Sequence, residues 1–345
     1  MTQRTRIGVA GLGRMGRHHA GNISGHCPSA ELVRVFDVDE ALAKQTAADL
    51  GTDWTTSYDH LLSDDVDAVV IAVPTSLHVD FVIRAARAGK HILCEKPLSL
   101  DRRSAREALE EVRRAGVKLQ VGFHRRFDPD WAAAASSIAA GELGDIYLFR
   151  TSLRDMAPPS VEYLRGSGGF FVDMTIHDFD TARWMIGEIK EVGAFGAALS
   201  GAPFEDAGDI DNGVITIRFT SGALGVIDNS RVAGYGYECS TEVMGSKGTV
   251  RIDRPNQLHL TWLSPGRSSR DYVKDFLQRY PAAYRQEMES FADAVANNKA
   301  VAVGGADALA AFDLCKAAEL SHKEKRVVKL EHRDGPGGIE YRAVT

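Results

Sequence analysis

The stretch RIGVAGLGRMG, residues 6–16, decides the fold of the first third of the chain. An apolar strand over Arg6–Ala10 runs into Gly11-Leu12-Gly13-Arg14-Met15-Gly16, and a helix is expected from about Gly13 to Ser24. In a strand–helix unit with this spacing, the first glycine permits the turn, the second lets the backbone approach a pyrophosphate, and the third lets the helix pack closely on the sheet. The helix N-terminus also attracts phosphates. The motif therefore predicts a dinucleotide site.

Strands and helices continue to alternate as far as Val121, which is typical of a doubly wound parallel sheet. After about Phe123, turn signals separate successive strand-like runs, which predicts a mostly antiparallel sheet with helices. We therefore expect a Rossmann domain at residues 1–123, an α+β domain for substrate binding and oligomerisation at residues 124–330, and a loose tail at residues 331–345. In the first domain, strands are expected at Leu32–Phe36, Ala68–Val73, His91–Cys94 and Lys118–Val121, and helices at Glu40–Leu50, His78–Ala88 and Asp101–Arg114; two late helices are expected near Ala283–Asn297 and Ala306–His322.

Asp37 ends the second expected strand, about 20 residues after the glycine motif. A carboxylate there accepts hydrogen bonds from both ribose hydroxyls of the adenosine half and repels a 2′-phosphate. Asp39 adds negative charge, and no arginine occupies position 38 or 39. We therefore predict NAD rather than NADP. The alternative is a set of turn and packing glycines beside an exposed aspartate.

Two further groups of residues follow strands at the carboxyl edge of the predicted sheet, where ligands bind in such folds. Pro74 and Thr75 follow the third strand, and His78 begins the helix after it. Glu95-Lys96-Pro97 follows the fourth strand. An acid, a cation and a proline directly after an apolar strand are not packing residues, although a lone lysine often extends into solvent. We expect all of them at the cofactor crevice.

Asp173 and His177 lie four residues apart in a helix expected over Val172–Ile186, so they share one helix face. Such a pair suits proton transfer near neutral pH, because histidine titrates there and a carboxylate orients it. The alternative is a capping aspartate beside a structural core histidine. No third ligand accompanies the pair, so no metal is predicted.

Oxidation of a secondary alcohol by NAD⁺ has three requirements. It needs a base for the hydroxyl proton, a positive charge where alkoxide character develops, and a rigidly held nicotinamide. His177, Lys96 and the crevice of the glycine loop would supply these in turn.

The composition excludes several classes of protein. With 41 Lys+Arg against 47 Asp+Glu in 345 residues, the net charge of −6 argues against nucleic acid or an anionic membrane as the partner. We expect neither a secretory signal nor a membrane span, because no apolar run approaches about 20 residues. Four scattered cysteines predict reduced thiols in a cytoplasmic protein: Cys27, Cys94, Cys239 and Cys315.

These residues together resemble the Gfo/Idh/MocA family of NAD(P)-dependent sugar and cyclitol dehydrogenases, and within it the branch that oxidises inositol. The resemblance spans roughly residues 5–330. It rests on these segments: Gly11–Gly16, Glu95-Lys96-Pro97, Gly122–Asp128, Gly168–Asp180, Asn229-Ser230-Arg231, Tyr235-Gly236-Tyr237 and Gly245-Ser246-Lys247-Gly248.

The resemblance implies a catalytic set of Lys96, Asp173 and His177. In it His177 is the general base, Lys96 binds the reacting hydroxyl and Asp173 is coupled to both. It also implies further substrate contacts, from Arg125, Asp155 and Tyr237. Charged and bidentate groups suit a ring of hydroxyls, each of which donates and accepts. His124 is a departure, since the family commonly carries Asn or an apolar residue there; near the cleft it could change which polyol fits.

The resemblance further implies oxidation of myo-inositol to its 2-keto form by a homotetramer. The same chemistry on scyllo-inositol, D-chiro-inositol or an aldose such as glucose remains open. An alternative of another class is a non-catalytic NAD-binding redox sensor. Such a sensor would keep the glycine motif and Asp37 but would have no reason to keep Lys96, Asp173 and His177 together.

Overall fold

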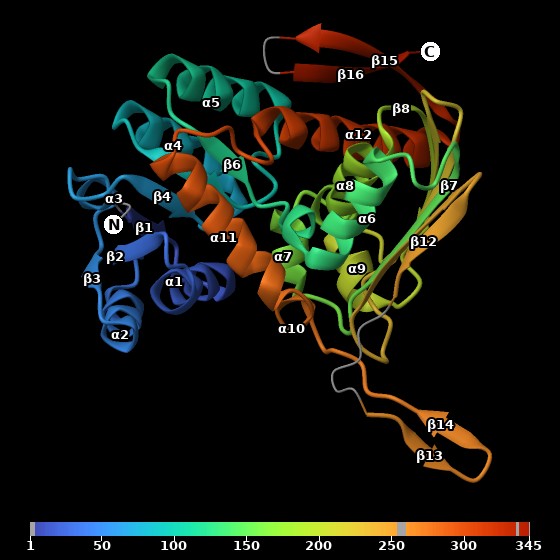
Figure 1. Ribbon diagram of the computed structural model, residues 1–345, viewed down its shortest axis with the longest axis horizontal. Coiled ribbons are helices and arrows are strands. Elements are labelled where there is room, and N and C mark those ends of the chain that lie inside the picture. The colour runs from blue at the N-terminus through green and yellow to red at the C-terminus, as the bar shows by residue number, and fades with distance from the viewer. Residues whose placement is uncertain (1–3, 254–259, 336–337, 345) are drawn as a thin grey trace. The chain divides into compact units, whose positions relative to one another are not determined.

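The computed structural model describes residues 4–253, 260–335 and 338–344, which form two compact units. The first unit consists mainly of Met1–Asp128 and Ala282–Leu309, and the second mainly of Pro129–Pro281 and Ala310–Gly335. Each unit has its own sheet (Figure 1). No helix of the described residues is both long and apolar enough to cross a membrane.

The first unit contains a six-stranded parallel sheet in the order β3-β2-β1-β4-β5-β6. This confirms the predicted doubly wound fold. The strand order reverses between β1 and β4, which is where such sheets bind ligands, at the carboxyl ends of the strands. The strands are β1 (Thr5–Ala10), β2 (Ala30–Phe36), β3 (Asp53–Thr55), β4 (Ala68–Ile71), β5 (His91–Cys94) and β6 (Leu119–Val121).

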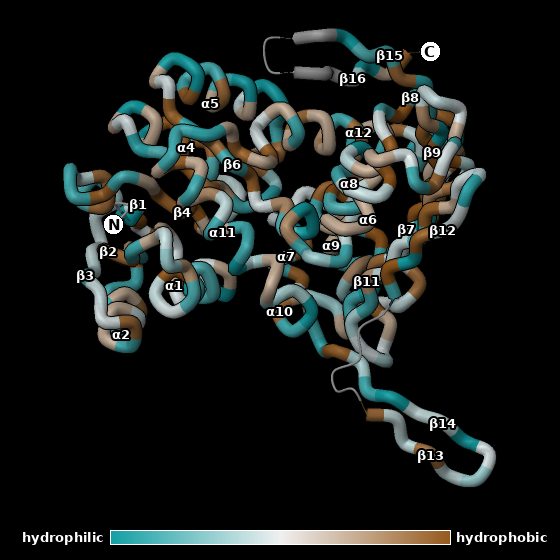
Figure 2. The backbone as a smooth tube through the Cα atoms, viewed as in Figure 1, coloured by the Kyte–Doolittle hydropathy of each residue, from teal (hydrophilic) through white to brown (hydrophobic). Residues whose placement is uncertain are grey.

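Helix α5 of the first unit buries a narrow apolar stripe and exposes a polar face to solvent. Figure 2 shows that hydrophilic residues make up most of α5, whose buried positions are Ala105, Ala108 and Val112. The helices are α1 (Arg14–His26), α2 (Glu40–Leu50), α3 (Tyr58–Leu61), α4 (Thr75–Arg87), α5 (Arg102–Ala115) and α11 (Pro281–Ala296). The 3₁₀ turn η1 (His124–Phe127) follows β6.

The helix α11 lies in the first unit, whereas we expected it in the second domain. Its residues Met288 and Phe291 are fully buried in one cluster with Ile7 of β1 and Leu93 of β5. A single boundary at residue 124 therefore does not describe the chain, which returns to the first unit at residue 282. The apolar face of a helix predicts that the face will be buried, but it does not predict which sheet the helix will pack against. That choice depends on tertiary structure.

The second unit contains an eight-stranded sheet in the order β12-β11-β7-β10-β9-β8-β15-β16. The pairings are mostly antiparallel, as predicted, with one parallel pair between β7 and β10. Along β9, Ile215, Ile217 and Phe219 are buried and alternate with exposed residues. The strands are β7 (Ile146–Arg154), β8 (Ile189–Ala197), β9 (Asn212–Phe219), β10 (Leu224–Ser230), β11 (Glu238–Gly245), β12 (Gly248–Ile252), β15 (Val328–Gly335) and β16 (Gly338–Val344).

Several further elements complete this unit. The stretch expected as one helix over Val172–Ile186 begins with a π-helical turn, which is frequent at functional sites. The elements are α6 (Pro129–Ala139), α7 (Val161–Gly166), the π turn η2 (Phe171–Thr175), α8 (Ile176–Ile186), α9 (Ala202–Ala207), β13 (Trp262–Ser264), β14 (Arg267–Ser269), α10 (Phe276–Arg279) and α12 (Gly305–Glu324).

The tail expected to be loose beyond Leu330 instead contains most of β15 and all of β16, apart from residues 336, 337 and 345, which lie outside the described residues. Val328 pairs with Val192 of β8, and Val328 is fully buried. Tyr341 is also buried, and its hydroxyl donates to Glu188. The polar, glycine-rich composition of the tail concealed the buried position of Tyr341.

Candidate cofactor and catalytic sites

The glycine motif forms the turn between β1 and α1, and two of its glycines are required by the fold itself. Gly11 has φ +87°, in the left-handed region, and a Cβ there would lie 2.7 Å from the carbonyl oxygen of Ala72. A Cβ on Gly16 would lie 1.7 Å from the carbonyl oxygen of Gly11. Helix α1 therefore packs against its own turn so closely that only glycine fits.

Gly13 is different, because nothing within the protein requires a glycine there. Its φ of −63° is open to any residue, and no heavy atom lies within 4 Å of an added Cβ. It is the exposed N-cap residue of α1, followed by Arg14 and Met15 in the first helical turn. Open space at a helix N-terminus is what a bound pyrophosphate needs, so these residues fit a dinucleotide.

Asp37 is held beside the glycine motif by the backbone. The N–H of Leu12 donates to its Oδ2 at 2.7 Å, and the N–H of Asp39 donates to its Oδ1 at 3.0 Å. The structure therefore brings together the two parts of the predicted dinucleotide site. The side chain of Asp39 instead caps α2, accepting from the N–H groups of Ala41 and Leu42.

Replacing Asp37 with asparagine should weaken NAD binding about tenfold, because a charged acceptor of hydrogen bonds is lost. The preference for NAD over NADP should also fall, since the repulsion of a 2′-phosphate disappears. Fluorescence titration with both cofactors measures this. Asp39→Asn is the matched control, because it removes an equal charge nearby while asparagine still caps a helix. Equal effects of the two variants would contradict the assignment.

His78 lies in the first turn of α4, which begins at Thr75 after the N-cap residue Pro74. Its ring is buried, with Nδ1 2.8 Å from the carbonyl oxygen of Pro97 and Nε2 2.9 Å from that of Val73. Burial lowers the pKa of His78, although both carbonyls favour its protonated form. The side chain ties the segment after β4 to the segment after β5, which carries Lys96.

Glu95 is buried beside α1, where Nε2 of His19 donates to its Oε1 at 2.6 Å. Its Oε2 accepts from the backbone N–H of Lys96 at 3.2 Å. Burial would raise the pKa of Glu95, but the hydrogen bond and charge interaction with His19 outweigh it and lower the pKa. An ionised Glu95 therefore links α1 to the lysine segment. The sequence did not single out His19, because its partner lies 76 positions away.

Glu287 of α11 is a second carboxyl in this region, with an exposed fraction of 0 %. Among the described residues, no hydrogen-bond partner is found for either of its side-chain oxygens. Burial raises the pKa of Glu287 well above its usual range, and the charge of Glu95 adds to the effect. The folded protein therefore keeps Glu287 protonated where the unfolded chain would ionise it.

The substitution Glu287→Gln should flatten the dependence of stability on pH. A carboxyl whose folded pKa is raised stabilises the fold only while protonated, so the wild type loses stability as pH rises above about 4.3. An amide does not ionise, so the Tm of the variant should rise relative to that of the wild type as the pH increases above about 5. Thermal unfolding across that range measures the difference. The exposed Glu31→Gln is the control, and parallel curves for E287Q and wild type would contradict the prediction.

His124 and Arg125, predicted to bind substrate, lie in η1 and are both buried. The ring of His124 stacks on that of Tyr284, with centroids 4.7 Å apart and an angle of 27° between the rings. Tyr284 belongs to α11, so this contact also depends on the return of the chain to the first unit. The neighbouring Arg126 pairs with Asp307 at 2.9 Å.

The other predicted catalytic residues lie in the second unit. Asp173 belongs to the π turn η2 and is 8 % exposed, whereas the half-buried His177 lies in the first turn of α8. Asp155 directly follows β7, and Tyr237 is buried before β11 with its ring edge-on to Tyr280. Because Lys96 belongs to the first unit, its joint action with Asp173 and His177 stays a prediction.

Two side chains that the sequence did not identify as site residues hold the carboxylate of Asp173. Nη1 of Arg231 donates to its Oδ2 at 2.9 Å, and the hydroxyl of Tyr163 donates to its Oδ1 at 2.9 Å. Burial lowers the pKa of Arg231, but the charge and hydrogen bond of Asp173 outweigh it and raise the pKa. Asp155 acts electrostatically on both Arg231 and Tyr163, which places it in the same neighbourhood.

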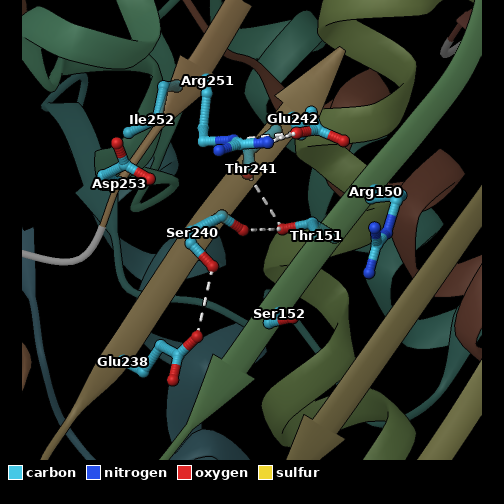
Figure 3. A pocket seen from close by; sticks show the side chains of 10 residues that line it. All are labelled: Arg150, Thr151, Ser152, Glu238, Ser240, Thr241, Glu242, Arg251, Ile252 and Asp253. Carbon is cyan, nitrogen blue, oxygen red and sulfur yellow. Dashed lines mark hydrogen bonds and ion pairs between the residues drawn. The ribbon is translucent and has the colours of Figure 1, made fainter. Parts of the chain in front are cut away.

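Figure 3 shows a hollow of about 250 Å³ in the second unit, lined by polar side chains of β7, β11 and β12. Thr151, Ser240 and Glu242 are among them, and no predicted site residue lines it. It is therefore separate from the candidate catalytic residues. Within the described residues, no group of three or more His, Cys, Asp or Glu is arranged to hold a metal ion.

Comparison with known proteins agrees with this geometry. Residues 5–123 match an oxidoreductase family with an NAD-binding Rossmann fold, and residues 135–330 match the C-terminal alpha/beta domain of that family. The chain is 43% identical to the myo-inositol 2-dehydrogenase of Thermotoga maritima, over 94% of this chain and 98% of the other. It is 40% identical to the scyllo-inositol 2-dehydrogenase (NAD(+)) of Bacillus subtilis, over 96% and 98%.

Solved structures lead to the same family. The crystal structure of a myo-inositol dehydrogenase from Corynebacterium glutamicum has a TM-score of 0.91 and 36% identity, covering 95% of this chain and 99% of that one. The resemblance suggested by the sequence is confirmed, and so is NAD as the cofactor. This chain belongs to the Gfo/Idh/MocA family of NAD-dependent oxidoreductases.

Proposed function

We propose that this oxidoreductase converts myo-inositol to its 2-keto form, scyllo-inosose, by hydride transfer to NAD⁺. The observation that carries the proposal is the 43% identity, across 94% of the chain, with a relative named for that reaction. The presence of Lys96, Asp173 and His177 supports it, because a protein that only bound NAD would have no reason to keep all three.

In this mechanism bound NAD⁺ supplies the hydride acceptor. His177 accepts the proton of the reacting hydroxyl as general base, because histidine exchanges protons near neutral pH. The ammonium group of Lys96 binds the same oxygen and stabilises its alkoxide character. Asp173, which belongs to η2, orients the reacting groups.

Polyol recognition falls to groups that can bind vicinal hydroxyls. Arg125 offers a planar fork of donors, and Asp155 accepts from two hydroxyls. His124 and Tyr237 complete the proposed set; the stack of His124 on Tyr284 restricts the orientation of its ring.

The second candidate substrate is scyllo-inositol. It is favoured by the 40% identity with a relative named for that isomer. The two isomers differ in the orientation of one hydroxyl, so few contacts separate them. D-chiro-inositol and glucose are further candidate substrates for the same chemistry.

The test is NADH formation by purified protein with myo-inositol, scyllo-inositol, D-chiro-inositol and glucose, each offered NAD⁺ and NADP⁺. Turnover of myo-inositol with NAD⁺ supports the proposal. If only another polyol is oxidised, the proposed reaction type stands but the assigned substrate is wrong. His124 is then the first residue to substitute. If no polyol reacts although NAD⁺ binds, the redox-sensor alternative takes its place.

We further propose a cytoplasmic homotetramer. All four cysteines are buried thiols, which suits a reducing compartment. The sheet of the second unit exposes apolar side chains, including Phe195, Val214 and Leu224, that a subunit interface would cover. Light scattering of the purified protein measures the assembly.

A further inference from the structure

A buried arginine holds the proposed catalytic aspartate. Arg231 follows β10 and is 2 % exposed, with its guanidinium 2.9 Å from Oδ2 of Asp173. A second nearby carboxylate is that of Asp209, whose Oδ2 lies 3.7 Å from Nη2 of Arg231. A single buried cation therefore stands between two aspartates that lie far apart in the sequence.

The remaining oxygen of Asp173 is also occupied. The hydroxyl of Tyr163, on α7, donates to Oδ1, so each carboxylate oxygen accepts a hydrogen bond from a different element. Removing one partner of a buried, hydrogen-bonded charge pair leaves the other charge uncompensated. Charge-assisted hydrogen bonds of this kind also strongly favour the ionised carboxylate.

Asp209 connects the same arginine to the backbone of the catalytic segment. Its Oδ1 accepts from the N–H of Phe170 at 3.0 Å, at the start of the turn that carries Asp173. The guanidinium carbon of Arg231 lies 5.8 Å from the centre of the Phe170 ring. Arg231 therefore fixes the side chain of Asp173, and Asp209 fixes the backbone that presents it.

We propose that Arg231 is a positioning residue that, with Tyr163, keeps Asp173 ionised and immobile during turnover. Asp173 is then an orienting carboxylate and not a proton acceptor, which leaves the proton of the substrate to His177. The charged and titratable groups around Asp173 include Arg231 after β10, Tyr163 of α7, Asp209 after α9 and Asp155 after β7. His177 follows Asp173 by four residues, on α8. This inference adds to the proposed function and rests on it, because turnover here means the oxidation of a polyol by NAD⁺.

The test compares Arg231→Met with Arg34→Met. Arg34 is an equally demanding control, because it is also buried and lies 2.8 Å from Asp65 and 3.8 Å from Asp53. Both variants should lose stability. Only R231M should lower kcat, by about 100-fold, because misplacing a catalytic group is that costly. R34M should keep kcat within about twofold, because its site is independent. Arg231→Lys retains the charge without the fork and should restore part of kcat.

A second measurement does not depend on activity. The carboxyl ¹³C resonance of Asp173 is assigned with Asp173→Asn. Its chemical shift should report an ionised carboxylate from about pH 5 to about pH 8 in the wild type, and should change with pH within that range in R231M. A resonance that titrates there in the wild type would overturn the inference, even if R231M does not fold. So would a wild-type kcat in R231M. If the resonance behaves as expected but no polyol is oxidised, the proposed function fails and the ionised state of Asp173 stands.

Discussion

Alanine in place of His177 is expected to lower kcat about a thousandfold while NAD still binds, because general acid–base catalysis contributes on that scale. His177 lies in the second unit on α8, and the glycine motif and Asp37 lie in the first, so the substitution changes none of the residues proposed to bind the dinucleotide. The affinity for NAD, measured by fluorescence titration, should therefore stay at the wild-type value. Initial rates of NADH formation with saturating polyol measure kcat.

The control for this variant is His60→Ala, which removes an exposed histidine of α3. The backbone carbonyl of His60 accepts from Arg34 and Ser63 and its backbone N–H donates to Ser57, and alanine keeps these bonds. Its kcat should match the wild type. A His177→Ala enzyme that retained more than about a tenth of the wild-type kcat would show that another group accepts the proton. A variant that lost NAD binding as well would show that His177 also maintains the fold.

The glycine motif should separate into two classes of position when each glycine is replaced by alanine. Gly16→Ala places a methyl group 1.7 Å from the carbonyl oxygen of Gly11, and backbone atoms have little room to move. We expect it to lower the free energy of unfolding by on the order of 3–5 kcal/mol. Gly13→Ala meets no protein atom within 4 Å. It should cost at most about 1 kcal/mol, as an N-cap change, but weaken NAD binding at least tenfold.

Gly21→Ala completes the comparison, because it lies in the same helix and also meets no atom within 4 Å. It should stabilise the protein by about 1 kcal/mol without changing NAD affinity. Thermal unfolding and cofactor titration of the three variants measure both properties. If Gly13→Ala bound NAD as tightly as the wild type, the open space at that residue would not be the pyrophosphate site.

Local sequence patterns were sufficient for the parts of the protein whose interactions are short in range. The strand before Gly11, the turn and the helix after it form one continuous segment, so its residues constrain one another directly. Along β9, the alternation of apolar and polar residues in the sequence matches the alternation of buried and exposed residues in the structure. The expected strand β5 and helix α2 agree with the structure at both ends. For α2 the ends are marked locally, because the side chain of Asp39 caps its start and Gly51 in the left-handed conformation ends it.

Residues that act across long distances in the chain were not predictable in the same way. His19 and Glu95 are 76 positions apart, and Asp173 and Arg231 are 58 apart. Local context singled out Glu95 and Asp173 as site residues, but it did not identify their partners His19 and Arg231, because no periodicity connects the members of a pair. Charged residues of this kind occur mostly on surfaces, so only the fold shows that these are buried and paired.

The sequence by itself determined the parallel fold of the first third, the dinucleotide turn with Asp37 and the family to which the chain belongs. It did so because each depends on residues whose spacing follows directly from the geometry of a strand, a turn or a helix. Only the tertiary structure decided that α11 completes the first unit, that the last residues form strands, and that Arg231 and Tyr163 hold Asp173. Those outcomes depend on which buried surfaces and charges meet, and chain segments distant in sequence meet only once the protein is folded.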